Sequence, residues 1–159
     1  AAVFVGISLI SYSPKDPSLN VARPVGSFPI HNLLGYSGAV ISDLVFQLLG
    51  ISGFTLPLLF LLDALFCFST PSLSKIVIKN IALLLAGFSI GLLFNIFSPK
   101  LSFLGHAIPS AGVMGTFINH VGIRYVGRFG AFLIYIAIIW ASLTLLINRS
   151  LIGILKPVF

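Results

Sequence analysis

Residues 35–53 read GYSGAVISDLVFQLLGISG, and residues 112–130 read GVMGTFINHVGIRYVGRFG. Both stretches carry glycines in the pattern G-x2-G-x11-G-x2-G, and the second set follows the first by 77 residues throughout. Four matches in one register indicate an internal repeat. The repeat glycines are Gly35, Gly38, Gly50 and Gly53 in the first copy and Gly112, Gly115, Gly127 and Gly130 in the second.

Between the glycine pairs, apolar residues recur at spacings of three and four, which draws one face of a helix. These stripe residues are Val40, Ile41, Leu44 and Leu48 in the first copy and Phe117, Ile118, Val121 and Tyr125 in the second. The pattern predicts amphipathic helices over about 35–49 and 112–126. Such a helix beside a membrane span lies at the interface, with its apolar face toward acyl chains or toward the helix bundle.

The Gly-x2-Gly ends of the two helices have two ordinary explanations. They let the chain turn from an interfacial helix into a span, or they let helices approach closely. Contacts between subunits through the same glycines are the alternative.

The composition is that of a membrane protein. Hydrophobic residues make up 58% of the 159 residues and charged residues 8%, against about 25% charged in soluble domains. The net charge of +6 is scattered along the chain, so a nucleic-acid surface is not indicated. Cys67 is the one cysteine, which excludes an internal disulfide, and no Cys/His spacing suggests a metal site.

Four apolar segments are candidate spans: about 1–12, 51–68, 76–97 and 129–147. The first is short, and we interpret it as a truncated transmembrane helix; a cleaved signal peptide would need a basic leader, which is missing. A Ser-Pro-Lys exit follows the first span at 13–15 and the third at 98–100. We therefore expect one all-α integral membrane domain over 1–159, built as two parallel-repeat hairpins, each with an outer amphipathic helix before the returning span.

The link at 69–74 is very short, so its two flanking spans form an antiparallel hairpin. Four spans then place both termini on the side of this link. That side carries Lys75, Lys79, Arg149 and Lys156, against Lys15, Arg23, Lys100, Arg124 and Arg128 on the other. Because the first group is denser and closer to helix ends, charge favours cytoplasmic termini.

Few residues suggest chemistry. Asp63 is the one acidic residue inside a predicted span, where an ionisable group is a functional candidate, and we expect Lys75 or Lys79 as its partner at the inner interface. A buried subunit contact, or a transporter or channel using Asp63, is the alternative. Arg124 and Arg128 are one turn apart and suit lipid phosphates or an anionic partner, although snorkelling explains them equally well. No catalytic, cofactor-binding or metal-binding residues are predicted.

Two further segments carry a family resemblance. Residues 12–18, YSPKDPS, resemble the Y-S-P-x-D-P-S segment in the amino-terminal four-span domain of the FtsK/SpoIIIE family of bacterial DNA translocases. Residues 32–50 are similar to that domain's N-x2-G-x2-G-A-x2-A-D-x6-G stretch, with Ser42 where Ala is common, and residues 111–115 resemble its second-loop G-G-x2-G. The motif positions are Tyr12, Ser13, Pro14, Asp16, Pro17, Ser18, Asn32 and Asp43.

The resemblance implies a non-catalytic anchor and oligomerisation module for a DNA pump at the division septum, in the bacterial inner membrane with both termini cytoplasmic. It implies the lipid bilayer, other division proteins and further copies of the chain, plausibly a hexamer, as partners. DNA and ATP would be bound only by a motor outside this chain, which contains no G-x4-G-K-[ST] loop and needs no cofactor of its own. A structural septal scaffold without a motor shares every feature of the chain.

Overall fold

The computed structural model describes residues 1–18, 29–68, 72–103 and 105–147. Three residues of the predicted short link, 69–71, and the charges Arg23, Arg149 and Lys156 lie outside the described residues. The elements in chain order are α1 (Ala2–Ile10), α2 (Gly35–Leu49), the 3-10 helix η1 (Gly50–Phe54), α3 (Thr55–Cys67), α4 (Leu73–Phe97), β1 (Lys100–Phe103), β2 (His106–Pro109) and α5 (Gly112–Ile147).

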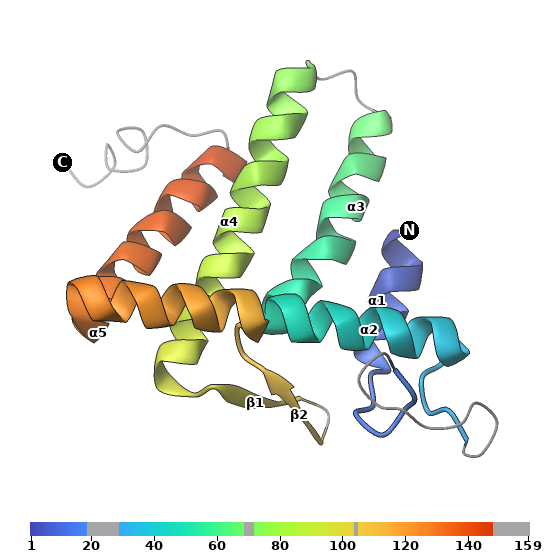
Figure 1. Ribbon diagram of the computed structural model, residues 1–159. Coiled ribbons are helices and arrows are strands. Elements are labelled where there is room, and N and C mark those ends of the chain that lie inside the picture. Colours follow the sequence, from blue (N-terminus) through green and yellow to red (C-terminus); the bar gives the residue numbers. More distant parts are fainter. Residues whose placement is uncertain (19–28, 69–71, 104, 148–159) are drawn as a thin grey trace.

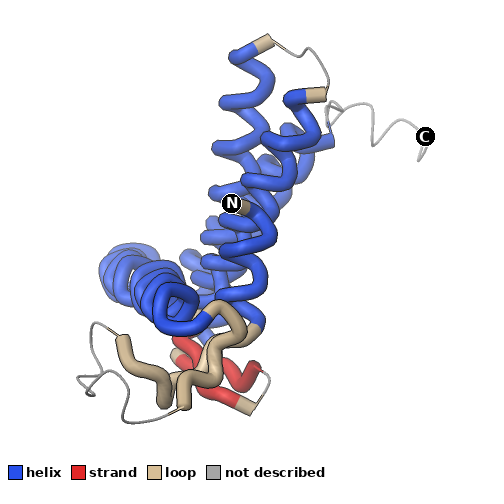
Figure 2. Tube along the Cα trace, turned by 90° about the vertical axis from the view of Figure 1, so that its right-hand side faces the viewer, coloured by secondary structure: helices blue, strands red, loops and turns tan. Residues whose placement is uncertain are grey.

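The helices form a flat set and a rising set that run in different directions (Figure 1). Helix α2 and the first part of α5 lie almost end to end in one line at the base of the molecule, whereas α1, α3, α4 and the rest of α5 rise from that line. The turned view shows the flat helices beside the lower ends of the rising ones (Figure 2). This is the geometry expected of interfacial helices next to spans.

Glycines make the bends between the two sets. Gly50 ends α2 with φ 62° and ψ −144°, and Gly127 divides α5 with φ 73° and ψ 170°. Helix starts show the same correspondence, because Gly35 and Gly112 have φ 64° and 61°. Positive φ is strained for residues with a Cβ atom, so glycine suits all four positions. The two units thus repeat in backbone conformation as well as in sequence.

Three helical segments are long and apolar enough to cross a membrane: Gly35–Phe66, Leu73–Phe97 and Gly112–Ile147. The first and third each include a flat part before their bend. The 25 residues of α4 extend about 37 Å, more than the roughly 30 Å of a bilayer's hydrocarbon core. Helix α1 has nine described residues, about half of a span.

The segment after α4 corrects the expectation of an all-helical chain. Strands β1 and β2 pair antiparallel, with Lys100 opposite Pro109 and Phe103 opposite His106. Gly105, at φ 81°, lies in the connection. Ile108 is fully buried, which fixes the hairpin against the helices. Four-residue strands give too short an alternation of apolar residues for the period-two signal to be recognised.

Two small apolar clusters hold the two sets together. Leu9, Val45, Phe46 and Ile108 join α1, α2 and the hairpin, and Leu92, Ala111, Ala131 and Tyr135 join α4 to α5. In contrast, many large apolar side chains on the rising helices are exposed, including Leu65 and Phe97. A water-soluble protein rarely exposes so much apolar surface, whereas acyl chains would cover it in a membrane.

The apolar stripe of the second flat helix faces away from the bundle, whereas in α2 Leu44 and Leu48 are exposed but Ile41 packs against the cluster around Phe46. Phe117 is 69% exposed and Tyr125 82%, whereas Asn119, on the opposite side, is 2% exposed. In α2, Gly38, Ser42 and Asp43 are likewise among the buried residues. Of the two environments predicted for the stripe of the second copy, acyl chains therefore fit and the bundle does not.

Candidate functional site

The residues of the family motif converge where α1 ends and α2 begins. Asp16 is 3% exposed, and its carboxylate accepts hydrogen bonds from the backbone amides of His31 at 2.9 Å and Asn32 at 2.8 Å. The His31 imidazole Nδ1 also lies 2.9 Å from the carboxylate. A buried carboxylate is tolerated when it accepts several such bonds. Asp16 thus connects the exit of α1 to the start of the flat helix.

Asn32 continues this network into the first unit. Its side-chain amide donates to the backbone oxygens of Ser8 at 2.9 Å and Ser11 at 3.3 Å, both near the end of α1. Its side-chain oxygen accepts from the amide of Leu34 at 3.1 Å. Because one carboxamide supplies two donors and an acceptor, this position needs Asn and not an acid or a hydroxyl.

Asp43 forms the second buried carboxylate of the network. The Tyr12 hydroxyl donates to it across 3.4 Å, and the Gln47 side-chain amide donates to its other oxygen. Burial, reinforced by the negative charge of Asp43, raises the pKa of Tyr12, which follows the end of α1, to about 12. The phenol therefore stays protonated and remains a donor to Asp43.

The other motif positions support the same turn. The Ser13 hydroxyl accepts from the backbone amide of Lys15 at 3.3 Å, and Pro17 is buried. Pro14 is exposed and Ser18 is half-buried. The structure thus joins Tyr12, Ser13, Asp16, Asn32 and Asp43 in one buried polar region, while Pro14 lies on its surface.

The second unit has its own buried network, without a carboxylate. Asn119, which occupies the repeat position of Ser42, donates to the Leu92 backbone oxygen and to the Asn95 side chain, both at 2.9 Å. The Tyr135 hydroxyl donates to the Asn119 side-chain oxygen at 2.7 Å. Asn95 in turn donates to the Ser110 hydroxyl at 3.1 Å. Asn95 and Ser110 were not predicted as contact residues, although a lone amide in an apolar span is a signal for polar helix contacts.

The two units meet at Gly50 and Gly112. A Cβ atom on Gly50 would lie 2.5 Å from the Gly112 nitrogen, and one on Gly112 would lie 2.5 Å from the Leu48 carbonyl. The Ile51 amide donates to the Ser110 oxygen at 3.2 Å beside this contact. Backbone therefore packs on backbone where the flat helices join, and both predicted uses of the glycines, turning and close approach, occur at this one place.

The remaining repeat glycines have local contacts. A Cβ atom on Gly38, Gly53 or Gly115 would overlap Asn32, Val45 or Ala111, respectively. The one on Gly130 would lie 3.0 Å from Val126, and Gly35 and Gly127 have open space around them.

A second glycine pair, which the sequence analysis did not single out, brings α4 against η1 and α3. Gly87 and Gly91 form a G-x3-G pattern in α4, the spacing that lets transmembrane helices approach closely. A Cβ atom on Gly87 would overlap the Thr55 methyl, and one on Gly91 would overlap the Ser52 hydroxyl. These glycines set the distance between the first unit and α4.

Asp63 has a different partner from the one expected. The Asn80 side-chain amide donates to its carboxylate at 2.8 Å, and no lysine among the described residues forms an ion pair with it. Lys79 instead lies 5.5 Å from the centre of the Phe66 ring. Asn80 and Asp63 face each other between α4 and α3, whereas the longer Lys79 side chain lies over the Phe66 ring. A proton or cation pathway through Asp63 is not favoured by this neutral partner.

Two histidines, His106 and His120, and the two outer arginines lie outside these networks, whereas His31 belongs to the network of Asp16. Arg124 and Arg128 are exposed on either side of the Gly127 bend. His31, His106 and His120 lie on different elements, and within the described residues no group of three His, Cys, Asp or Glu side chains could hold a metal ion.

Flat and rising helices, spans of sufficient length and exposed apolar surface define an integral membrane protein of the helical class. The family model for the 4TM region of DNA translocase FtsK/SpoIIIE matches residues 1–158. The chain belongs to this family, which confirms the resemblance of its motifs, and it corresponds to the membrane region and not to the motor. No solved structure matches the chain.

Proposed function

We propose that this chain is the membrane-anchoring and oligomerisation region of a DNA translocase that acts at the division septum in chromosome segregation. The observation that carries the proposal is the match of almost the whole chain to the membrane region of a DNA translocase family. Three helices long and apolar enough to span a bilayer agree with an anchoring role. The chain itself performs no catalytic step in this proposal.

The buried networks support a mechanical role. An anchor transmits the reaction force of the motor to the membrane, so its helices must resist being pulled apart. Asn32 holds α1 to α2, and Asn119 holds α4 to α5, each through hydrogen bonds between elements. Within an apolar environment these bonds have no water to replace them. The networks thus fit a rigid base better than a moving gate.

The attachment to a motor is tested by the rest of the gene. We expect the reading frame to encode a polar linker and a G-x4-G-K-[ST] phosphate-binding loop after residue 159. A full-length protein without such a loop would overturn the DNA-translocase role and favour the motor-free septal scaffold.

Self-association is tested in membranes. Phe117 and Tyr125 are exposed on the flat part of α5, where a second copy can make contact. Phe117→Cys in a Cys67→Ser background should form cross-linked dimers and higher species, plausibly up to a hexamer, with a bifunctional thiol reagent. Leu145→Cys, exposed near the opposite end of α5, is a second reporter for a contact between copies at that end. Monomer at every protein concentration and with both variants would contradict the oligomerisation role.

The septal location is tested by microscopy. A fluorescent fusion of residues 1–159 should concentrate at division sites together with other division proteins. A uniform signal around the cell membrane would show that this region anchors the protein without directing it to the septum.

A further inference from the structure

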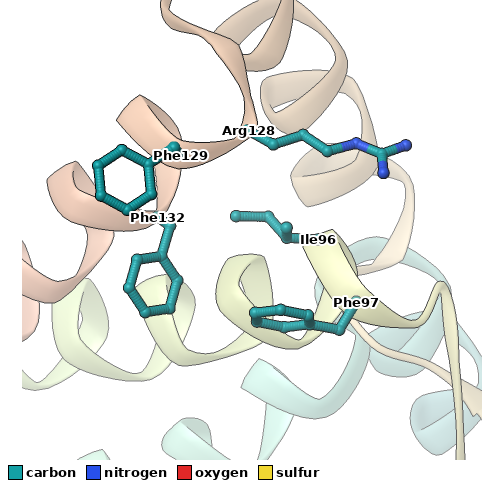
Figure 3. A pocket seen from close by; sticks show the side chains of 5 residues that line it. All are labelled: Ile96, Phe97, Arg128, Phe129 and Phe132. Atoms are coloured by element: carbon teal, nitrogen blue, oxygen red, sulfur yellow. The ribbon is translucent and has the colours of Figure 1, made fainter.

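The bend in α5 places a cationic side chain between two adjoining cavities. One, of about 370 Å³, lies between α4 and α5 and is lined by Ile96, Phe97, Phe129 and Phe132, with Arg128 at its edge. Figure 3 shows the phenyl rings of Phe97, Phe129 and Phe132 grouped together and the Arg128 guanidinium extending away from them. Arg128 also lines the other cavity, of about 500 Å³, together with His120, Ile123 and Arg124. A basic cavity and an apolar cavity therefore share one wall.

Arg124 and Arg128 have no anionic partner among the described residues. The chain contains three acidic residues, and each is engaged elsewhere. Asp16 binds His31 and Asn32, Asp43 binds Tyr12 and Gln47, and Asp63 binds Asn80. Neither Arg124 nor Arg128 forms an ion pair within the described residues. Two unpaired guanidinium groups that line the same cavity, on either side of the Gly127 bend, therefore favour an anion from outside the chain.

The position of the bend indicates what kind of anion this is. Gly127 joins the flat part of α5 to its rising part, so Arg128 lies where an interfacial helix enters a span (Figure 1). Phospholipid headgroups occupy this level of a membrane. A further cavity of about 300 Å³, lined by Ile90, Leu93 and Phe94, shares Phe97 and Phe132 with the first. The apolar groove thus continues along α4, as an acyl chain beneath the headgroup would.

We propose that this site binds one anionic phospholipid of the phosphatidylglycerol type. Its phosphate contacts Arg124 and Arg128, and one acyl chain lies in the groove between α4 and α5. A zwitterionic lipid fits less well, because the three aspartate side chains are engaged elsewhere and cannot receive its ammonium group. A free phosphate would leave the groove unused. The proposal does not depend on whether a motor is attached.

The test measures lipid binding to the whole chain and needs no assumption about its function. The purified protein in neutral detergent is titrated with phosphatidylglycerol or phosphatidylcholine and analysed by native mass spectrometry. We expect the parent protein to prefer phosphatidylglycerol. Arg128→Gln should weaken phosphatidylglycerol binding about tenfold, the loss expected for one charge-assisted hydrogen bond, and leave phosphatidylcholine binding unchanged. Arg124→Gln is the second variant if the first does not fold.

Lys100→Gln is the matched control, because it removes the same charge from an exposed position on β1 outside both cavities. It should retain parental binding. Phe132→Ala should weaken binding of long-chain phosphatidylglycerol more than that of a short-chain analogue. Equal losses in Lys100→Gln and Arg128→Gln, or unchanged binding in both arginine variants, would overturn the site. Competition by millimolar inorganic phosphate as strong as by the lipid would show an anion site without a lipid groove.

Discussion

Gly50 and Gly35 share a positive φ but have different surroundings. Their φ angles are 62° and 64°, yet a Cβ atom would meet backbone 2.5 Å away at Gly50 and nothing within 4 Å at Gly35. Gly35→Ala should therefore lower the unfolding free energy by about 1–2 kcal/mol, which is the strain of a positive φ at a residue with a Cβ atom. Gly50→Ala should cost clearly more, because the joined ends of the flat helices must separate.

Reversible unfolding of both variants in mixed micelles measures this difference. A Gly50→Ala loss no larger than that of Gly35→Ala would show that the chain accommodates the methyl group and that the Gly50–Gly112 contact is not close in solution.

Asp16 carries another prediction at the scale of single residues. Asp16→Asn replaces a carboxylate that accepts from two backbone amides by a group with one acceptor oxygen. We expect a loss of about 1.5–3 kcal/mol in unfolding free energy, the usual range for hydrogen bonds to a charged group. Lys15→Gln, at an exposed neighbouring position, should change stability by less than about 0.5 kcal/mol. Equal stability of Asp16→Asn and the parent would contradict the network.

At the scale of elements, the contact between α4 and α3 depends on the absence of one methyl group. Gly87→Ala places a Cβ atom on the Thr55 methyl and should cost about 1–3 kcal/mol by overpacking. Thr55→Ser removes that methyl but keeps the hydroxyl that donates to the Ser52 oxygen at 2.7 Å. The double variant should therefore regain most of the lost stability in the same unfolding assay. Additive losses in the double variant would refute this contact.

In the molecule as a whole, the β-hairpin lies at the opposite end from the last turn of α3 and the first turn of α4 (Figure 1). If both termini are cytoplasmic, the hairpin faces outward. Both tests use a Cys67→Ser background and cells whose outer layer is permeabilised but whose inner membrane is intact. Ser102→Cys on β1 should react with an impermeant maleimide in these cells. Ser74→Cys at the start of α4 should react only after the inner membrane is disrupted. The reverse pattern would invert the proposed orientation.

Local features were predictable because they depend on near neighbours in the chain. The periodic stripes predicted helices at 35–49 and 112–126, and the structure has helix at both. The repeat glycines predicted bends, which occur at Gly50 and Gly127. The β-hairpin was missed because its strands are four residues long. The predicted partner of Asp63 was wrong, because opposite charge suggested a lysine, whereas the packing of α3 on α4 places Asn80 beside the carboxylate.

The class of protein, the repeat, the flat helices and the family could be predicted before folding was considered, since composition, periodicity and motif spacing are properties of the linear chain. Which groups meet depends on the folded arrangement. Asp16, Asn32 and Asp43 come together because α1 crosses α2, and Asn119 meets Tyr135 because α5 folds back at Gly127. Hydrogen bonds and close packing act over a few ångströms in space, so they depend on how distant segments are placed and not on their separation in sequence.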